Sequence, residues 1–238
     1  IAIVILCCCT INVVVVKVNW DSNQVIQNTT VIDDLLIQGG EKVTLSAGAT
    51  LTVRTRIVIN GTVSNPVNII QEKEASDFII DSISEDSKIS NAVFVTTSVA
   101  ARNSWLYVEL RGNATKETTL WIQNSKFVRG SGIRVTPGDT NIGRYKLKVV
   151  NNNFEDVSGA LKVFSGISDF AVEFKYNVIE EKLFNNTNWP TLFAFTCKNY
   201  DNGPKELVVD SNDITLVSGV SQYVMESSCL ETVFTNNI

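Results

Sequence analysis

Histidine is absent from this 238-residue sequence, and both methionine (1) and proline (4) are scarce. The absence of histidine excludes a Ser-His-Asp triad and a His-ligated zinc site, because both need an imidazole. The sequence also lacks a phosphate-binding glycine loop, a Cys-x-x-Cys pair and a serine elbow. These absences favour a protein without catalytic activity, and an enzyme of another chemistry stays the alternative.

A clustered basic surface is also missing. The formal net charge is −5, and the arginines are scattered among acidic residues. Nucleic-acid binding needs a basic patch on one face of the protein. The sequence therefore predicts no nucleic-acid partner.

The residues that are abundant form strands and turns. Asn, Thr, Ser, Val and Ile dominate, and apolar runs of four to eight residues alternate with Gly, Asn-Gly and Asn-Pro turns. No amphipathic helical pattern separates these runs. An all-β fold is therefore expected.

An Asn-rich corner recurs along the second half of the chain, for example in residues 147–163, LKVVNNNFEDVSGALKV. The apolar residues that close the successive corners are Phe94, Phe127, Phe154, Val178, Ile214 and Ile238. Their spacings of 33, 27, 24, 36 and 24 residues indicate a solenoid whose coil holds three short strands, with loops in the longer coils. A β-sandwich is the alternative, since many short strands also fit that fold.

Alternation within one repeat predicts which side chains are buried. Leu147, Val149 and Phe154 are expected to point into the tube, and Lys146 and Lys148 to point into solvent. Asparagine tolerates the left-handed backbone of a sharp corner and can stack on its counterpart one coil away. We therefore expect the replacement of Asn152 or Asn153 by Val to lower stability before it affects any function.

Three consecutive segments carry a family resemblance: residues 49–53 (ATLTV), 57–63 (IVINGTV) and 65–70 (NPVNII). Their style and order resemble the opening coils of right-handed parallel β-helix proteins, the pectin-lyase-like superfamily. In general appearance the chain is similar to the repeat type found in large extracellular and surface proteins. The resemblance implies a right-handed parallel β-helix and raises polysaccharide lyases and hydrolases as candidate activities.

The amino terminus, residues 1–18, is almost entirely apolar. This run is typical of a signal peptide or membrane anchor, and a buried first strand is the alternative. Residues 19–238 then form a single β-helix domain, which we expect to be truncated at both ends. The leader predicts an extracellular or cell-surface location, with any membrane contact made through residues 1–18.

Two further features bear on an oxidising compartment. Outside the leader, Cys197 and Cys229 form an even pair that predicts a disulfide, with two buried thiols as the alternative. Candidate glycosylation sequons begin at Asn28, Asn60, Asn113 and Asn185. With 24 Asn and 41 Ser or Thr residues, about four sequons are expected by chance, so they carry little weight.

Acidic residues are the candidates for a calcium-assisted lyase site, as the resemblance implies. The candidate groups are Asp77, Asp81, Glu85 and Asp86 with Lys88, and Glu155 and Asp156 with Arg134. Calcium needs several oxygens that converge on one point, and the spacing does not show such convergence. The adjacent Asp33 and Asp34 should face opposite sides of a strand and therefore form no joint site.

Exposed aromatic residues offer a second kind of site. Trp105 and Tyr107 share one face of a predicted strand, residues 104–110. They could stack on sugar rings, but the favoured interpretation is that they fill the tube or cover a loop. The overall expectation is a non-catalytic extracellular module with a structural, adhesive or recognition role. Its expected partner is an unidentified protein or carbohydrate surface ligand. No cofactor is expected, except calcium if the chain is a polysaccharide lyase.

Overall fold

A computed structural model describes residues 16–72, 76–81, 83–97, 106–112, 117–130, 132–141, 145–157, 159–165, 170–181, 191–197, 206–216, 223–227 and 232–238. These residues form strands, turns and corners, and none of them lies in a helix. Among them there is accordingly no helix with the length and apolarity needed to cross a membrane. The all-β prediction is confirmed.

The strands are short and follow one another closely. In chain order they are β1 (Lys17–Trp20), β2 (Gln24–Ile26), β3 (Thr30–Gln38), β4 (Lys42–Leu45), β5 (Thr50–Asn60), β6 (Val67–Gln71), β7 (Asp77–Asp81), β8 (Ser87–Ser90), β9 (Ala92–Thr96), β10 (Leu106–Gly112), β11 (Thr118–Gln123), β12 (Lys126–Val128), β13 (Ile133–Asn141), β14 (Tyr145–Val150), β15 (Asn153–Glu155), β16 (Leu161–Ser165), β17 (Phe170–Lys175), β18 (Val178–Glu181), β19 (Thr191–Cys197), β20 (Glu206–Asp210), β21 (Asp213–Leu216), β22 (Tyr223–Ser227) and β23 (Thr232–Thr235).

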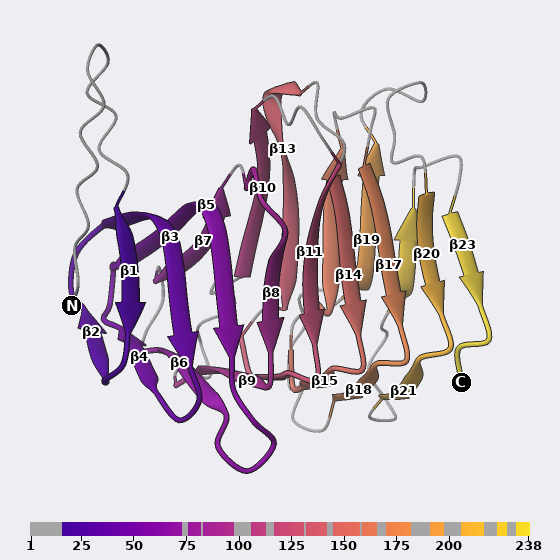
Figure 1. The fold of residues 1–238 in the computed structure, drawn as a ribbon. Coiled ribbons are helices and arrows are strands. Elements are labelled where there is room, and N and C mark those ends of the chain that lie inside the picture. Colours follow the sequence, from indigo (N-terminus) through magenta and orange to yellow (C-terminus); the bar gives the residue numbers. More distant parts are fainter. Residues whose placement is uncertain are drawn as a thin grey trace.

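The strands stack into a parallel solenoid with three faces (Figure 1). The first face runs from the first halves of β3 and β5 through β7, β10, β13, β16, β19 and β22. The second face runs from β1 and the second halves of β3 and β5 through β8, β11, β14, β17, β20 and β23. The third face contains β2, β4, β6, β9, β12, β15, β18 and β21.

Every pairing between the described strands is parallel and joins one coil to the next. This arrangement confirms the predicted solenoid. The alternative β-sandwich is wrong, because its sheets are built from antiparallel strands.

The first coils differ from the later ones because β3 and β5 each cover two faces. The bend in β3 lies at Asp33, where the register with β5 shifts between Ile32 and Asp34. Strand β1 begins at Lys17 and pairs with the second half of β3. Lys17 and Val18, assigned to the leader from sequence, therefore belong to the first strand of the solenoid.

The core fills the tube with alternate residues of each strand. Leu147, Val149 and Phe154 are buried and Lys146 and Lys148 face outward, as predicted. On the third face the aromatic rings of successive coils stack. Phe127 lies between Phe94 and Phe154, with ring centroids 4.8 and 4.7 Å apart and nearly parallel planes. Such offset stacking adds to the free energy of burial.

The corner between the second and third faces contains two rows of residues. We call the inward row the inner ladder; it consists of the buried residues Ser125, Asn152, Asn177 and Asn212 and the partly buried Asn237. Each side-chain oxygen accepts the backbone N–H of the corner residue one coil earlier, at 2.8 to 3.1 Å. The asparagine amides also donate to main-chain carbonyls, as Asn177 does to Val149 at 3.0 Å. The ladder thus satisfies buried backbone groups at a sharp turn.

The outer row precedes the inner ladder by one residue in each coil. It consists of Asn91, Asn124, Asn151, Tyr176, Ser211 and Asn236, all with φ between 50° and 56°. Asparagine adopts this left-handed conformation more readily than most residues. The three asparagines at 151, 152 and 153 therefore have different roles: Asn151 turns the chain, Asn152 joins the ladder, and Asn153 begins β15.

The predicted register is wrong in two coils. Phe154 pairs with Ile179, which is fully buried, whereas Val178 lies one position earlier and is 36% exposed. At the last corner Asn237 is the ladder residue, so Ile238 likewise follows the ladder directly and is exposed. The hydrogen-bonded corners are separated by 33, 27, 25, 35 and 25 residues. A pair of adjacent apolar residues fits either register, and only the ladder contacts decide between them.

Candidate functional site

The first group of acidic candidates does not converge on one point. Asp77 and Asp81 lie at opposite ends of β7 on the outside of the first face. Glu85 and Asp86 lie in the connection to β8, where a carboxylate oxygen of Asp86 accepts a backbone N–H from β11 at 2.9 Å. Lys88 belongs to the second face. These residues are therefore separated by a corner of the solenoid.

The second acidic group is also divided. Arg134 is on β13 in the first face, whereas Glu155 is on β15 in the third face, where it pairs with Lys126. Asp156 follows β15 with a φ of 54°. Across the described residues, no three acidic, cysteine or histidine side chains come together as metal ligands.

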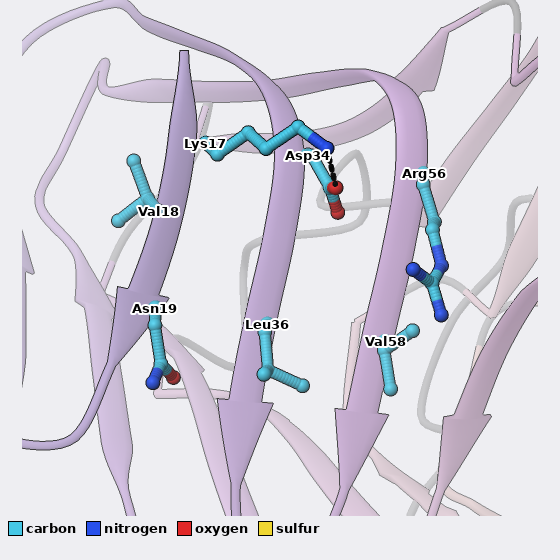
Figure 2. Close-up of a pocket in the computed structure, with 7 residues that line it drawn as sticks. All are labelled: Lys17, Val18, Asn19, Asp34, Leu36, Arg56 and Val58. Carbon is cyan, nitrogen blue, oxygen red and sulfur yellow. Dashed lines mark ion pairs between the residues drawn. The ribbon is translucent and has the colours of Figure 1, made fainter. Parts of the chain in front are cut away.

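A shallow hollow of about 300 Å³ lies on the second face near the amino terminus (Figure 2). Lys17, Asp34 and Arg56 occupy one level of three neighbouring strands, and Lys17 pairs with Asp34 at 3.2 Å. Leu36 and Val58 line the next level. The hollow is therefore lined by both charged and apolar side chains, and two of its charged groups neutralise each other.

The two adjacent aspartates have separate structural roles, in line with the prediction that they form no joint site. Asp33 accepts the backbone N–H of Val16 at 2.8 Å, and Asp34 pairs with Lys17. Both contacts attach the first strand to β3.

The cysteine and glycosylation predictions fall largely outside the described residues. Cys197 ends β19, and Cys229 lies outside the described part of the chain. Asn28 is exposed between β2 and β3, and Asn60 is exposed at the end of β5. The sequons at Asn113 and Asn185 also lie outside the described part. The disulfide stays a prediction.

Tyr107 lies on the outside of the first face. Its neighbours on β10, Leu106 and Val108, are buried in the tube, so Tyr107 points away from the core. Trp105, with which it was expected to share a surface, lies outside the described residues. Tyr107 instead has a different neighbour, because it pairs in register with Arg134 of the next coil.

Tyr107, Arg134 and Phe164 form a group that we call the aromatic–arginine cluster. The guanidinium carbon of Arg134 lies 5.8 Å from the centre of the Tyr107 ring and 4.6 Å from that of Phe164. These distances are within the range of cation–π attraction. The Nε of Arg134 is buried and has no hydrogen-bond partner among the described residues. The cluster therefore combines two half-buried rings with a positively charged group that retains hydrogen-bonding capacity.

Acidic residues border the cluster. Burial raises the pKa of the Tyr107 hydroxyl, the negative charges of Asp77 and Glu109 raise it further, and Arg134 opposes this shift. The hydroxyl is therefore protonated at neutral pH and can donate a hydrogen bond. Burial also raises the pKa of Asp77. Rings, a guanidinium and carboxylates on one surface can together contact the apolar face and the hydroxyl groups of a sugar.

Sequence reasoning included two members of this cluster but did not bring them together. Arg134 was grouped with Glu155 and Asp156, although it pairs in register with Tyr107 one coil away. Phe164 was not identified. Its outward position could have been found by alternation, since Leu161 and Val163 on the same strand are buried.

Comparison with known proteins returned no relatives. No protein-family model, curated protein or solved structure matches the chain. The fold and the cluster therefore carry the functional argument.

Proposed function

We propose that this chain is a non-catalytic recognition module of the extracellular space or cell surface, and that it binds carbohydrate through the aromatic–arginine cluster. The observation that carries this proposal is the position of Arg134 between Tyr107 and Phe164 on the outside of a sheet. We include in the proposal the right-handed winding of the pectin-lyase-like superfamily, which is the usual hand of parallel crossovers.

The chemistry of the cluster fits a sugar better than an apolar ligand. Aromatic rings contact the C–H face of a pyranose, while guanidinium and carboxylate groups bind its hydroxyls. Arg134 is the main donor, and Asp77 and Glu109 are acceptors near Tyr107. The strands that supply these residues and Phe164, namely β7, β10, β13 and β16, are paired in parallel in one sheet, so the groups keep their spacing without a ligand.

A glycan array probed with the purified protein tests this proposal. We expect the protein to bind a subset of glycans, and Arg134→Ala and Tyr107→Ala to weaken that binding by about tenfold or more. Thr52→Ala is the matched control, because Thr52 lies on the outside of the same face, on β5 beyond β7. This variant should bind like the wild type.

Two results would overturn the proposal. One is unchanged glycan binding by both cluster variants while they remain folded. The other is shortening of a bound polysaccharide with release of unsaturated products, which would identify a lyase. The test for polysaccharide cleavage should be run with and without calcium, because the lyases of the pectin-lyase-like superfamily, which the sequence resembles, are calcium-assisted.

A further inference from the structure

A second surface lies outside the corner that contains the inner ladder. It is a groove of about 620 Å³ that runs across the corners of successive coils, along the solenoid axis. The connection between β5 and β6 borders it at one end, and Tyr176 lies at the other. The groove is lined by the corner residues, by the β5–β6 connection and by strands of the third face, so it is separate from the aromatic–arginine cluster on the first face.

The border near β6 is held firmly. Gly61 donates its N–H to Ser90 O at 3.0 Å, and Val67 donates to Asn91 O at 3.2 Å. A Cβ at Gly61 would lie 2.2 Å from the carbonyl oxygen of Asn91, so only glycine permits this close approach. The connection between β5 and β6 thus packs directly on the next coil and bounds the groove.

Uncharged amides line the groove between its two ends. Asn124 and Asn151, both in the outer row, are exposed. The Oδ1 atom of Asn153 is buried and has no hydrogen-bond partner among the described residues. The side-chain amide of asparagine rotates easily about χ2, so a ligand hydroxyl in the groove could pair with this oxygen.

The groove is electrically neutral. Lys126 is the one charged residue among its described lining residues, and it forms an ion pair with Glu155 on the neighbouring strand. An anionic ligand therefore has no unpaired cation to bind here. The amides instead offer paired donors and acceptors, which suit the hydroxyl groups of a neutral molecule.

Tyr176 is unusual for its position. The other five members of the outer row are asparagine or serine, yet this coil has a tyrosine with φ of 56° and a side chain that is 57% exposed. A bulky residue in the left-handed region is strained, and asparagine would fit the same backbone better. Strain that is retained at one position is a reason to look for function there. An exposed ring at the end of a polar groove is suited to stacking on a sugar.

The distance between successive coils along the groove favours one class of ligand. Neighbouring coils are about 4.8 Å apart, so Asn91 and Tyr176, three coil steps apart, span roughly 14 Å. An extended peptide advances about 3.3 Å per residue and does not match this spacing. One pyranose unit of an extended glycan is about as long as one coil step. We propose that the groove binds a linear, neutral glycan along the solenoid axis, with Tyr176 stacked on one sugar ring and the amides bound to its hydroxyls.

The test is isothermal titration of the folded chain with cellohexaose and xylohexaose, and with an oligogalacturonate of equal length as the anionic comparison. We expect a Kd of about 1 mM or tighter for at least one neutral probe. In that series, affinity should rise with the number of sugar units up to about four and should not rise further, because the groove covers about three coil steps.

Tyr176→Asn is the decisive variant. It should weaken binding of the neutral probe by about tenfold or more, while raising the Tm by roughly 1–3 °C through relief of the left-handed strain. Asn151→Gly keeps the backbone conformation but removes an amide, and should weaken binding by about threefold to tenfold. Ser211→Asn is the matched control, because it introduces the same residue in the next coil, outside the groove lining. It should leave binding unchanged.

Three results would overturn the inference: no binding of either neutral probe at about 10 mM, equal or tighter binding of the oligogalacturonate, or unchanged binding by Tyr176→Asn. Arg134→Ala separates the two proposals. If it abolishes binding of the neutral probe while Tyr176→Asn does not, the aromatic–arginine cluster binds the glycan and the groove does not.

Discussion

The inner ladder and the outer row occupy adjacent positions in the same corner, and both consist mainly of asparagine. In the ladder, Asn177 is fully buried and its amide bonds to groups in both neighbouring coils. In the outer row, Asn151 is exposed and has the left-handed backbone. One position holds the coils together, while the other leaves its side chain available at the surface. The outer row can therefore hold a bulky residue, as Tyr176 shows, whereas the ladder positions hold only asparagine or serine.

The largest expected difference is between two single variants that replace asparagine by glycine, one in the ladder and one in the outer row. Asn177→Gly leaves the N–H of Asn152 and the carbonyl of Val149 without their side-chain partners, and should lower the free energy of unfolding by roughly 3–5 kcal/mol. Asn151→Gly should change it by about 0.5 kcal/mol or less, since glycine accepts the left-handed conformation. Urea unfolding measures both values, and equal losses would show that the two rows do not differ.

A smaller effect is expected for Asn152→Ser. Ser125 already occupies a ladder position, and its hydroxyl oxygen accepts the N–H of Ala92 at 3.1 Å. A serine hydroxyl at 152 can still accept the backbone N–H of Ser125, but it cannot replace the side-chain amide that donates to the carbonyl oxygen of Ile122. We expect a loss of about 1–2 kcal/mol, between the values for the two glycine variants. A loss as large as that of Asn177→Gly would mean that the acceptor alone does not support the ladder.

The smallest expected effect concerns an outward residue and depends on pH. Burial raises the pKa of Asp77, so the folded state binds its proton more tightly than the unfolded state. Its contribution to stability is therefore present at low pH and lost as the pH rises through the raised pKa. Asp77→Asn should raise the Tm slightly at neutral pH and leave it unchanged at about pH 3. An identical shift at both pH values would rule out the ionisation of Asp77 as its cause.

The local pattern of the sequence predicts much of this fold because each coil repeats the same physical requirements. Alternation identified Leu147, Val149 and Phe154 as core residues, and the Asn-rich corners indicated the solenoid. The pattern failed where two neighbouring residues satisfy it equally. Val178 and Ile179 are both apolar, and only the contact of Asn177 with Asn152 decides which of them is buried.

The candidate site was harder to predict because its members come from different coils. Tyr107 and Arg134 become neighbours only when the register between β10 and β13 is known, and the coils differ in length. The candidate site residues that lie close in sequence are separated by corners, as Asp77 and Lys88 are. Proximity along the chain is a poor guide in a solenoid, where the nearest surface neighbour lies a full coil away.

The central claim is that the outside of this solenoid recognises carbohydrate while the ladder maintains the fold. The most direct measurement is a titration of backbone amide NMR signals of the labelled protein with cellohexaose and with the best glycan from the array. We expect shifts for Asn124, Asn151 and Tyr176 with the first ligand, and for Tyr107 and Arg134 with the second. The buried ladder amides of Asn177 and Asn212 should stay unchanged. No shifts at these outward residues at about 1 mM ligand, or shifts spread through the ladder, would show that the outside of the solenoid does not bind these glycans in the proposed way.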